Sequence, residues 1–191
     1  MQNNFKYGIF FILALLFFSC EDDNSRIFLP NNVELSIWTS DIDDNFITGS
    51  FNPFPLVGAN NTRIFNKEHV DYCETLTVAV VYVENEYFIF PFLDLEAYEA
   101  INFNYGQTKI AVTHCPKTKT TITFNRNFHN SELLLRASGY LYRDNLVLYD
   151  ENSGIYYSQI LQKSITINST ETDMITLPTL IMEWKDAIAM F

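Results

Sequence analysis

Residues 113–118, which read THCPKT, carry the clearest chemical potential in this chain. A cysteine reacts as its thiolate, and the side chains of His114 and Lys117 could lower the pKa of the Cys115 thiol. The Thr118 hydroxyl could donate a hydrogen bond to that thiolate. These residue types therefore predict a candidate site for monothiol chemistry at Cys115.

Two other interpretations of Cys115 stay open at this point. Cys115 could be a chemically inert thiol, buried beside Pro116 in the core. It could also form a disulfide with Cys73, the only other cysteine once Cys20 is set aside for lipid attachment. An exported protein would permit that bond, but the spacing of two cysteines does not bring their sulfur atoms within reach of each other.

Metal binding is not predicted. His114 and Cys115 are adjacent, and neighbours on a strand point to opposite faces, so the two cannot ligate one ion without a bend. His129 is the other residue in this region whose side chain could ligate a metal ion. His69, in a polar stretch, is expected at the surface.

The acidic run at residues 41–45 begins like a calcium-binding loop, with the pattern D-x-D-x-N. Such a loop also needs glycine at its sixth position and glutamate at its twelfth, and these positions hold Phe46 and Asn52. A solvated acidic turn is therefore expected. The chain also lacks the G-x-S-x-G, G-x-x-x-x-G-K and G-x-G-x-x-G motifs, so no common catalytic class and no cofactor are predicted.

The N-terminus has the pattern of an export signal. Lys6 precedes an apolar stretch at residues 9–18, and Cys20 follows the small residue Ser19. The apolar stretch is about ten residues, whereas a helix needs about 20 to cross a bilayer, so residues 1–19 are predicted to be a cleaved signal peptide. A cysteine at the junction is typical of bacterial lipoproteins, which predicts lipidation of Cys20.

The lipid would attach the mature protein to a membrane, since more than one acyl chain gives stable anchoring. Residues 20–32 are predicted to be a polar tether. The acidic residues 21–23 resemble the tag with which Bacteroidetes send lipoproteins to the outer face of the outer membrane; an ordinary solvated linker is the alternative. The expected location is the outer membrane, exposed at the cell surface if the tag is genuine.

Charge excludes one class of partner. The formal net charge is -11, and removal of residues 1–19 takes away Lys6 alone, which gives -12. Phosphate backbones repel such a chain, so no nucleic-acid partner is expected. Apolar residues make up 48% of the sequence, enough for the core of one domain, predicted at residues 33–191.

The elements that must position these residues are mostly strands. Alternating or β-branched apolar runs, separated by turn residues such as those at 84–85 and 150–154, predict an antiparallel, mainly β fold of the barrel or sandwich kind. Helical spacing predicts one short helix at 93–103 and a C-terminal helix at 179–191. Residues 40–62 are expected to be irregular. The predicted strands are 33–38, 76–83, 86–92, 108–114, 120–126, 133–137, 145–149, 155–161, 163–168 and 174–177.

Two motifs carry a resemblance to a known family. Residues 109–126 (KIAVTHCPKTKTTITFNR) and residues 138–159, which open with SGYLYRDNLVLYD and close with IYYSQ, stand in the order found in DUF3179, a family of uncharacterised bacterial proteins. The closing Leu-Pro and Glu-Trp pairs at 177–178 and 183–184 also resemble that family. The resemblance runs from about Val83 to the end of the chain.

The resemblance directs attention to further residues. Arg126, at the family's F-x-R, is expected to clamp a carboxylate or the Asp150 side chain, or to form a structural salt bridge with Asp150 or Glu132. Tyr149, Asp150 and Gln159, together with His114, are candidate binding residues. Tyr149 and Gln159 could equally satisfy buried backbone groups.

One departure from the family affects the function. Many members have a second cysteine three positions after the first, a spacing suited to thiol–disulfide exchange, and that position is Thr118 here. Tyr157 replaces a family tryptophan, a milder change. The expected function is a membrane-anchored lipoprotein of unknown role, acting as a non-catalytic binding or structural module. The alternative is a monothiol redox protein with Cys115, Thr118 and Arg126 as catalytic residues. Any protein or small-molecule partner is unidentified.

Overall fold

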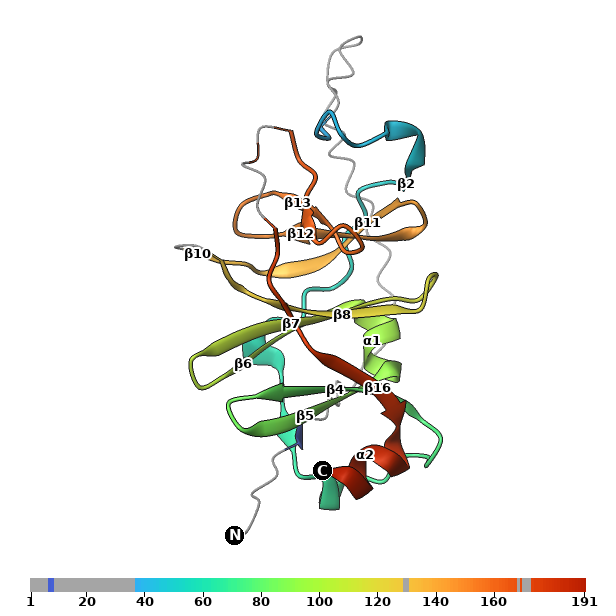
Figure 1. Cartoon of the computed structure of the whole chain (residues 1–191), viewed down its shortest axis with the longest axis vertical. Helices are drawn as coiled ribbons and strands as arrows, with labels where there is room; N and C mark the ends of the chain where they lie inside the picture. The colour runs from blue at the N-terminus through green and yellow to red at the C-terminus, as the bar shows by residue number, and fades with distance from the viewer. Residues whose placement is uncertain (1–6, 9–36, 129–130, 168, 170–172) are drawn as a thin grey trace, which may run out of the picture.

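The computed structural model describes residues 7–8, 37–128, 131–167, 169 and 173–191. Within these residues the chain forms three larger antiparallel sheets, stacked as layers along the long axis of the molecule (Figure 1). None of the three closes on itself in that part of the chain. The predicted mainly β fold is therefore confirmed, in its sandwich-like form.

The lowest sheet in Figure 1 has the strand order β16-β4-β5. Its elements are β4 (Thr77–Val83), β5 (Glu86–Pro91), β16 (Thr179–Glu183) and the helix that follows, α2 (Trp184–Met190). The predicted hairpin β4–β5 is confirmed: Glu84 and Asn85 both take positive φ, at 47° and 67°, as a two-residue hairpin turn requires. Trp184 and Ala187 of α2 pack on the outer face of this sheet.

The middle sheet has the order β15-β8-β7-β6 and is covered on both faces. Its strands are β6 (Ala100–Tyr105), β7 (Thr108–Cys115), β8 (Thr120–Asn125) and β15 (Thr176–Leu177). Along β7, Ile110 and Val112 pack against the lowest sheet, while Ala111 and Cys115 pack against the upper one. Residues 110–112 of this strand are accordingly apolar on both faces.

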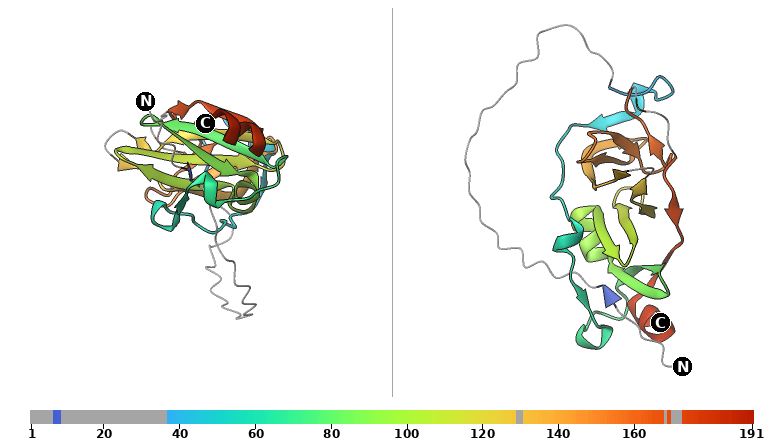
Figure 2. Two further views of the ribbon diagram at one scale, coloured as in Figure 1. Left: turned by 90° about the horizontal axis from the view of Figure 1, so that it is seen from below. Right: turned by 90° about the vertical axis from the view of Figure 1, so that its left-hand side faces the viewer.

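The upper sheet has the order β14-β13-β12-β11-β2. Its strands are β2 (Ile47–Gly49), β11 (Leu135–Tyr142), β12 (Asn145–Asp150), β13 (Tyr156–Ser158) and β14 (Lys163–Ser164). A second apolar cluster, which includes Trp38 and Val147, covers its outer face. Figure 2 shows the layers from two further directions.

A bulge interrupts β11 inside the second motif. The pairing with β12 shifts between Ala137 and Leu141, and Gly139 takes a φ of +87°. A Cβ atom at this glycine would lie 2.6 Å from the Ser50 carbonyl oxygen, so only glycine fits. The Ser138 hydroxyl donates to the Val147 carbonyl oxygen at 2.6 Å and fixes the bulge. The Ser-Gly pair of the motif is therefore structural.

Shorter elements complete the described part. They are the strands β3 (Ile64–Phe65), β9 (Asn127–Phe128) and β10 (Ser131–Glu132), and the 3₁₀ turns η1 (Asp44–Phe46), η2 (Ala59–Asn61) and η3 (Lys67–His69). The stretch at 40–62, predicted to be irregular, thus contains β2 and two short turns. Strand β11 extends five residues beyond the predicted end at Ala137, whereas β13, β14 and β15 are shorter than predicted.

The predicted helix at 93–103 is wrong in its second half. Helix α1 spans Phe92–Tyr98, Glu99 turns into the left-handed region with a φ of +57°, and β6 begins at Ala100. Residues 100–105 have apolar residues at helical spacing, but they also alternate. Pairing with β7 gives the backbone groups of alternate residues in this segment hydrogen-bond partners on a buried strand, so the strand prevails.

The predicted C-terminal helix at 179–191 is also wrong in its first part. Residues 179–183 form β16, which pairs with β4 in register from Thr179 opposite Val81 to Glu183 opposite Thr77. The helix begins only at Trp184. Ile181 is the residue that helical spacing misplaced, because the edge of β4 with which it pairs was not visible in the local sequence.

The N-terminal predictions mostly fall outside the described residues. These are the signal peptide 1–19 apart from β1 (Tyr7–Gly8), the lipidation site Cys20, the tether 20–32 and most of the strand 33–38. Strand β1 pairs with β3, and Trp38 forms a single bridge with Thr166. Within the described ranges no helix has both the length and the apolar character needed to cross a membrane.

Candidate functional site

Cys115 ends β7 where the loop of the β7–β8 hairpin begins, between the middle and upper sheets. The Lys119 N–H donates to the Cys115 carbonyl oxygen at 2.8 Å and closes the four-residue loop 116–119. The cysteine is 1% exposed and belongs to the apolar cluster that contains Ala111 and Phe124. Its Sγ faces the Asp144 carbonyl oxygen at 3.7 Å. The thiol is therefore enclosed between the two sheets and out of contact with solvent.

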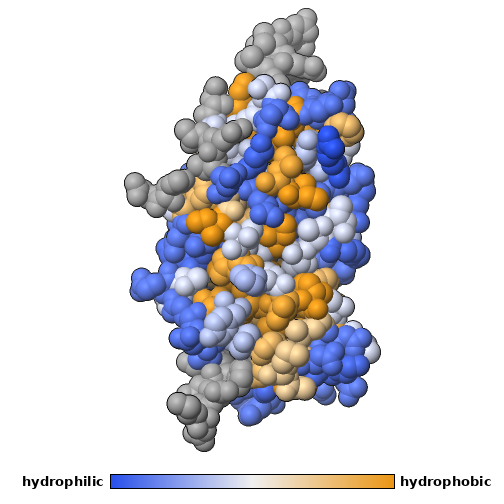
Figure 3. All heavy atoms as spheres, in the orientation of Figure 1, coloured by the Kyte–Doolittle hydropathy of each residue, from blue (hydrophilic) through white to orange (hydrophobic). Residues whose placement is uncertain are grey.

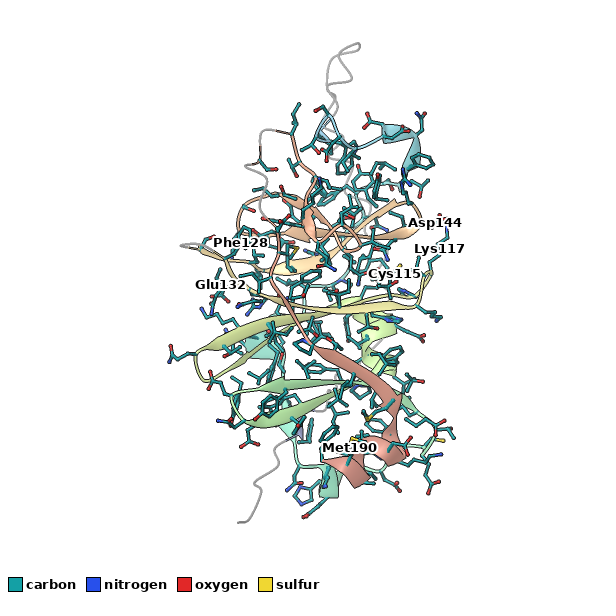
Figure 4. The ribbon with its side chains drawn as sticks, in the orientation of Figure 1. Cys115, Lys117, Phe128, Glu132, Asp144 and Met190 are labelled. Carbon is teal, nitrogen blue, oxygen red and sulfur yellow. The ribbon has the colours of Figure 1, made fainter. Side chains whose placement is uncertain are left out.

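The tip of the hairpin is tied down on two sides by exposed ion pairs. Lys117 contacts Asp144 in the β11–β12 turn at 2.6 Å, as Figure 4 shows beside Cys115. Lys119 contacts Glu96 of α1 at 2.9 Å. Lys117 thus points toward a carboxylate at the surface and away from the sulfur, which removes it as the cation expected to activate Cys115.

Thr118 bonds to other groups than the thiol. Its Oγ1 accepts a hydrogen bond from Asn145 Nδ2 at 2.8 Å and another from Thr120 Oγ1 at 2.9 Å. Asn145 itself is buried at the start of β12. The threonine therefore joins the hairpin loop to the upper sheet.

Gln159 makes a second polar link between the same two sheets. Its Nε2 donates to Thr113 Oγ1 at 2.9 Å and to the Thr120 carbonyl oxygen at 3.3 Å. Within the described part of the chain, Gln159 Oε1 and Asn145 Oδ1 are buried without a hydrogen-bond partner. The polar groups around Cys115 thus connect the middle sheet to the upper sheet. Two of their acceptor atoms receive no hydrogen bond.

His114 points to the opposite face of β7, as expected for a strand neighbour of Cys115. Its Nδ1 lies 2.8 Å from Thr121 Oγ1, and its ring centroid is 4.5 Å from that of Phe92 in α1. Burial lowers the pKa of the imidazole, with Glu96 opposing and Lys119 adding to that shift. A neutral histidine on the far face cannot provide the cation that a Cys115 thiolate needs.

Arg126 is the most completely enclosed cation of the described residues, at 0% exposure. Its Nε donates to the Ile110 carbonyl oxygen at 2.9 Å and its first terminal nitrogen to the Leu133 carbonyl oxygen at 2.9 Å. The second terminal nitrogen bonds Asn104 Oδ1 and lies 3.0 Å from Glu132 Oε1. The structural alternative for Arg126 is therefore what the contacts show, with Glu132 as the partner carboxylate.

Asp150 closes the turn at 150–154 instead of meeting Arg126. Its carboxylate accepts hydrogen bonds from the Leu134 N–H at 2.6 Å and the Ser153 N–H at 3.1 Å. Tyr149, one residue earlier, faces outward and is only half-buried. Its ring lies 5.1 Å from those of Phe51 and Tyr156. Among the candidate binding residues, Tyr149 is thus the one that contributes to the surface.

Two asparagines of β6, Asn102 and Asn104, make structural hydrogen bonds that the sequence did not predict. Asn102, fully buried, donates to the carbonyl oxygens of Val57 and Leu135 at 2.8 Å and accepts from the Leu135 N–H at 3.0 Å. Both asparagines alternate with aromatic and apolar residues in INFNY, a strand pattern that places the polar residues on one face. Assigning that segment to a helix concealed the signal.

The two cysteines within the described residues, Cys73 and Cys115, are unpaired. Cys73 is exposed in the loop before β4, and its Sγ lies 3.3 Å from Thr75 Oγ1, a contact that lowers the pKa of this thiol. Cys115 is enclosed between two sheets, so the disulfide alternative is not seen. No group of three or more histidine, cysteine and acidic residues within the described ranges is arranged to hold a metal ion. His129 lies outside those ranges.

Residues 54–191 match a family described as "Protein of unknown function (DUF3179)". The chain belongs to the DUF3179 family. The match includes both motifs and starts well before Val83, where the motif resemblance began. No curated protein and no solved structure matches the chain. In this DUF3179 protein, the motif residues described above therefore have to be interpreted from their own contacts.

Proposed function

We propose that this DUF3179 protein is an exported, lipid-anchored module that acts by binding or as a structural component, without catalysis. The observation that carries the proposal is the enclosure of its motif residues. Cys115, Arg126, Asp150 and Gln159 are buried, and their polar atoms are mostly engaged inside the fold. A catalytic group must touch its substrate, and these four do not reach the surface.

The same contacts count against the monothiol alternative. A reactive thiol needs access and a nearby cation or a dipole that lowers its pKa. Lys117 is engaged by Asp144, His114 lies on the other face of β7, and Arg126 is surrounded by its own acceptors. A partner would therefore have to bind at the surface. One accessible aromatic site there is the half-buried ring of Tyr149 packed against exposed Phe51.

Alkylation of the two structured cysteines in the full chain tests the absence of catalysis. We expect Cys73, exposed, to react with iodoacetamide at pH 7.5, and Cys115 to react at least about 100-fold more slowly until the protein is denatured. Peptide mass mapping measures both thiols in one sample, so Cys73 is the internal control. A Cys115 that reacts as fast as Cys73 in the native protein, and keeps doing so below pH 7, would restore the redox alternative.

Lipid attachment is tested in a bacterium with the lipoprotein pathway. We expect a labelled fatty acid to be incorporated into the parent chain and the chain to sediment with the outer membrane, because Cys20 carries the anchor. A Cys20→Ala variant should lose both. Label that persists in the Cys20→Ala variant, or a parent chain without label, would contradict the anchor while leaving the binding role to be judged from Cys115.

A further inference from the structure

Strand β16 lies at the edge of the lowest sheet, and its side chains form an apolar surface. β4 is its one strand neighbour within the described residues. The C-terminal segment follows the outer margin of the molecule in the right-hand view of Figure 2. Leu180 and Ile181 are 48% and 49% exposed. Figure 3 shows the apolar residues gathered over β16 and α2 in the lower half of the face.

The pairing with β4 determines which backbone groups of β16 face outward. The Trp184 N–H donates to the carbonyl oxygen of Leu76, directly opposite in the same register, so the even-numbered residues of β16 bond to β4. In an antiparallel pair these positions alternate. Thr179, Ile181 and Glu183 therefore direct their N–H and C=O groups away from β4, toward the free edge. An exposed row of this kind is a template for another strand.

We propose that the occupant of this edge is a second copy of the chain, with the two β16 strands antiparallel about a two-fold axis at Ile181. In this register Ile181 faces Ile181 of the second copy, and Thr179 faces Glu183 of the second copy. All three outward-facing positions are then paired in both copies. A two-fold interface uses the same surface twice, so that surface must complement itself.

The side chains meet that requirement. In this register Leu180 lies opposite Met182 of the second copy. Beside Met182, on the same face of the sheet, a shallow groove of about 450 Å³ is lined by Met182, Asp186, Ala189 and Met190. The exposed Leu180 of each copy is placed to fill the groove of the other. Figure 4 labels Met190, which lies on α2 below β16.

Charge also favours self-pairing in this register. Residues 179–182 carry no charge, which matters for a chain with a net charge of -11 that otherwise repels its own copies. Glu183 faces a threonine instead of another Glu183, and its carboxylate already lies 2.6 Å from Lys185 Nζ. A parallel pairing or a shift of two residues would lose the match between Leu180 and the groove.

The interface is small, since one five-residue strand and one side of a short helix fall well below the 20–30 residues a side of a standard interface. The dimer is therefore expected to be weak, and populated where copies are concentrated. The inference does not rest on the lipid anchor, although attachment of both copies to one membrane would raise their local concentration.

Cysteine cross-linking in the full chain tests the register, with Cys73→Ser in every variant to remove the exposed thiol. In a hydrogen-bonded antiparallel pair, opposite Cα atoms lie about 5.5 Å apart, within reach of a disulfide. We expect Ile181→Cys to cross-link to itself. Thr179→Cys and Glu183→Cys should cross-link when mixed, but neither should do so alone. The exposed site Lys117→Cys, on the hairpin of the middle sheet, measures random collisions.

A second variant tests the groove. Leu180→Asp, added to Ile181→Cys, is expected to reduce the cross-linking at least about 10-fold, because it places a carboxylate against Asp186 of the second copy. Circular dichroism of each variant confirms folding, and the substituted side chains are exposed. The proposal is overturned if Ile181→Cys cross-links no faster than Lys117→Cys, if Thr179→Cys alone cross-links equally well, or if Ile181→Cys instead captures a different protein.

Discussion

Arg126 is a charged residue of the family motif whose contacts are structural. Its guanidinium joins β7 at Ile110 to the segment before β11 at Leu133, and Glu132 partly neutralises it. Burial lowers the pKa of Arg126, and the Glu132 carboxylate opposes that shift. The planar fork satisfies two backbone carbonyl groups that would otherwise be buried without donors.

Replacement of Arg126 by lysine should therefore destabilise the protein even though the charge is kept. We expect a loss of about 2–4 kcal/mol in the free energy of unfolding, because an ammonium group cannot reach all of the acceptors of the fork. Urea denaturation followed by circular dichroism measures the difference. Arg63→Lys, at an exposed position, is the matched control and should change the free energy of unfolding by less than about 0.5 kcal/mol.

A stable Arg126→Lys protein would contradict this structural role. If its free energy of unfolding matched that of Arg63→Lys while a cellular phenotype was lost, Arg126 would have to be a binding residue after all.

At the scale of elements, the sequence was a good guide where local pattern and tertiary pairing agree. The β4–β5 hairpin was predictable because its apolar runs and its turn at 84–85 both favour it. The pattern was ambiguous at 100–105 and at 179–183, where apolar residues satisfy helical and strand spacing alike. There the outcome depended on pairing with another strand. Residues 100–105 pair with β7, which follows directly in the chain, and residues 179–183 pair with β4, which lies far away in the sequence.

The sequence identified candidate residues but not their surroundings. The motifs at 109–126 and 138–159 do meet in space, with Cys115 against the turn that contains Asp144. Burial decided the rest: whether a cysteine, arginine or glutamine is exposed depends on the layer that covers it. The resemblance supplied positions, and it could not supply the groups that Thr118 and His114 contact.

The bulge in β11 provides a prediction at this scale. We expect Gly139→Ala to lower the free energy of unfolding by at least about 2 kcal/mol, because the new Cβ meets the Ser50 carbonyl oxygen and φ is positive. Thermal and urea denaturation measure the loss. Gly58→Ala is the control, since φ is -78° there and the nearest atom to its Cβ is 3.9 Å away. Equal stability of the two variants would refute the role assigned to the bulge.

For the whole molecule, α1 introduces a dependence of stability on pH. Burial raises the pKa of Asp94, and likewise that of Glu99, to about 7 from usual values of 3.8 and 4.5. Between about pH 4 and 7 the folded chain keeps protons that the unfolded chain releases. These two groups therefore make the protein less stable as pH rises through that window, and their effect levels off above pH 7.

Glu99→Gln should remove its share of this effect. At pH 8 we expect the variant to be more stable than the parent by about 1 kcal/mol, a value reduced for the partial exposure of the carboxyl group, and at pH 4 to differ little. Urea denaturation at four pH values measures the trend. The exposed Glu68→Gln variant should follow the parent at every pH, and a Glu99→Gln variant that does so too would show that the carboxyl group is well solvated.

The double coverage of the middle sheet has a consequence for the order in which backbone amides exchange with deuterium. Amides of β7 between Ile110 and Val112 lie under apolar layers on both faces, so solvent reaches them only when the sheets separate. Amides of Ile181 and Thr179 face an edge and exchange through small local openings. In a concentrated sample, pairing of two copies would slow Ile181 directly, because its amide becomes paired, and would slow Val112 only by the gain in global stability that association brings. Ile181 is thus a reporter of association and Val112 a reporter of global unfolding.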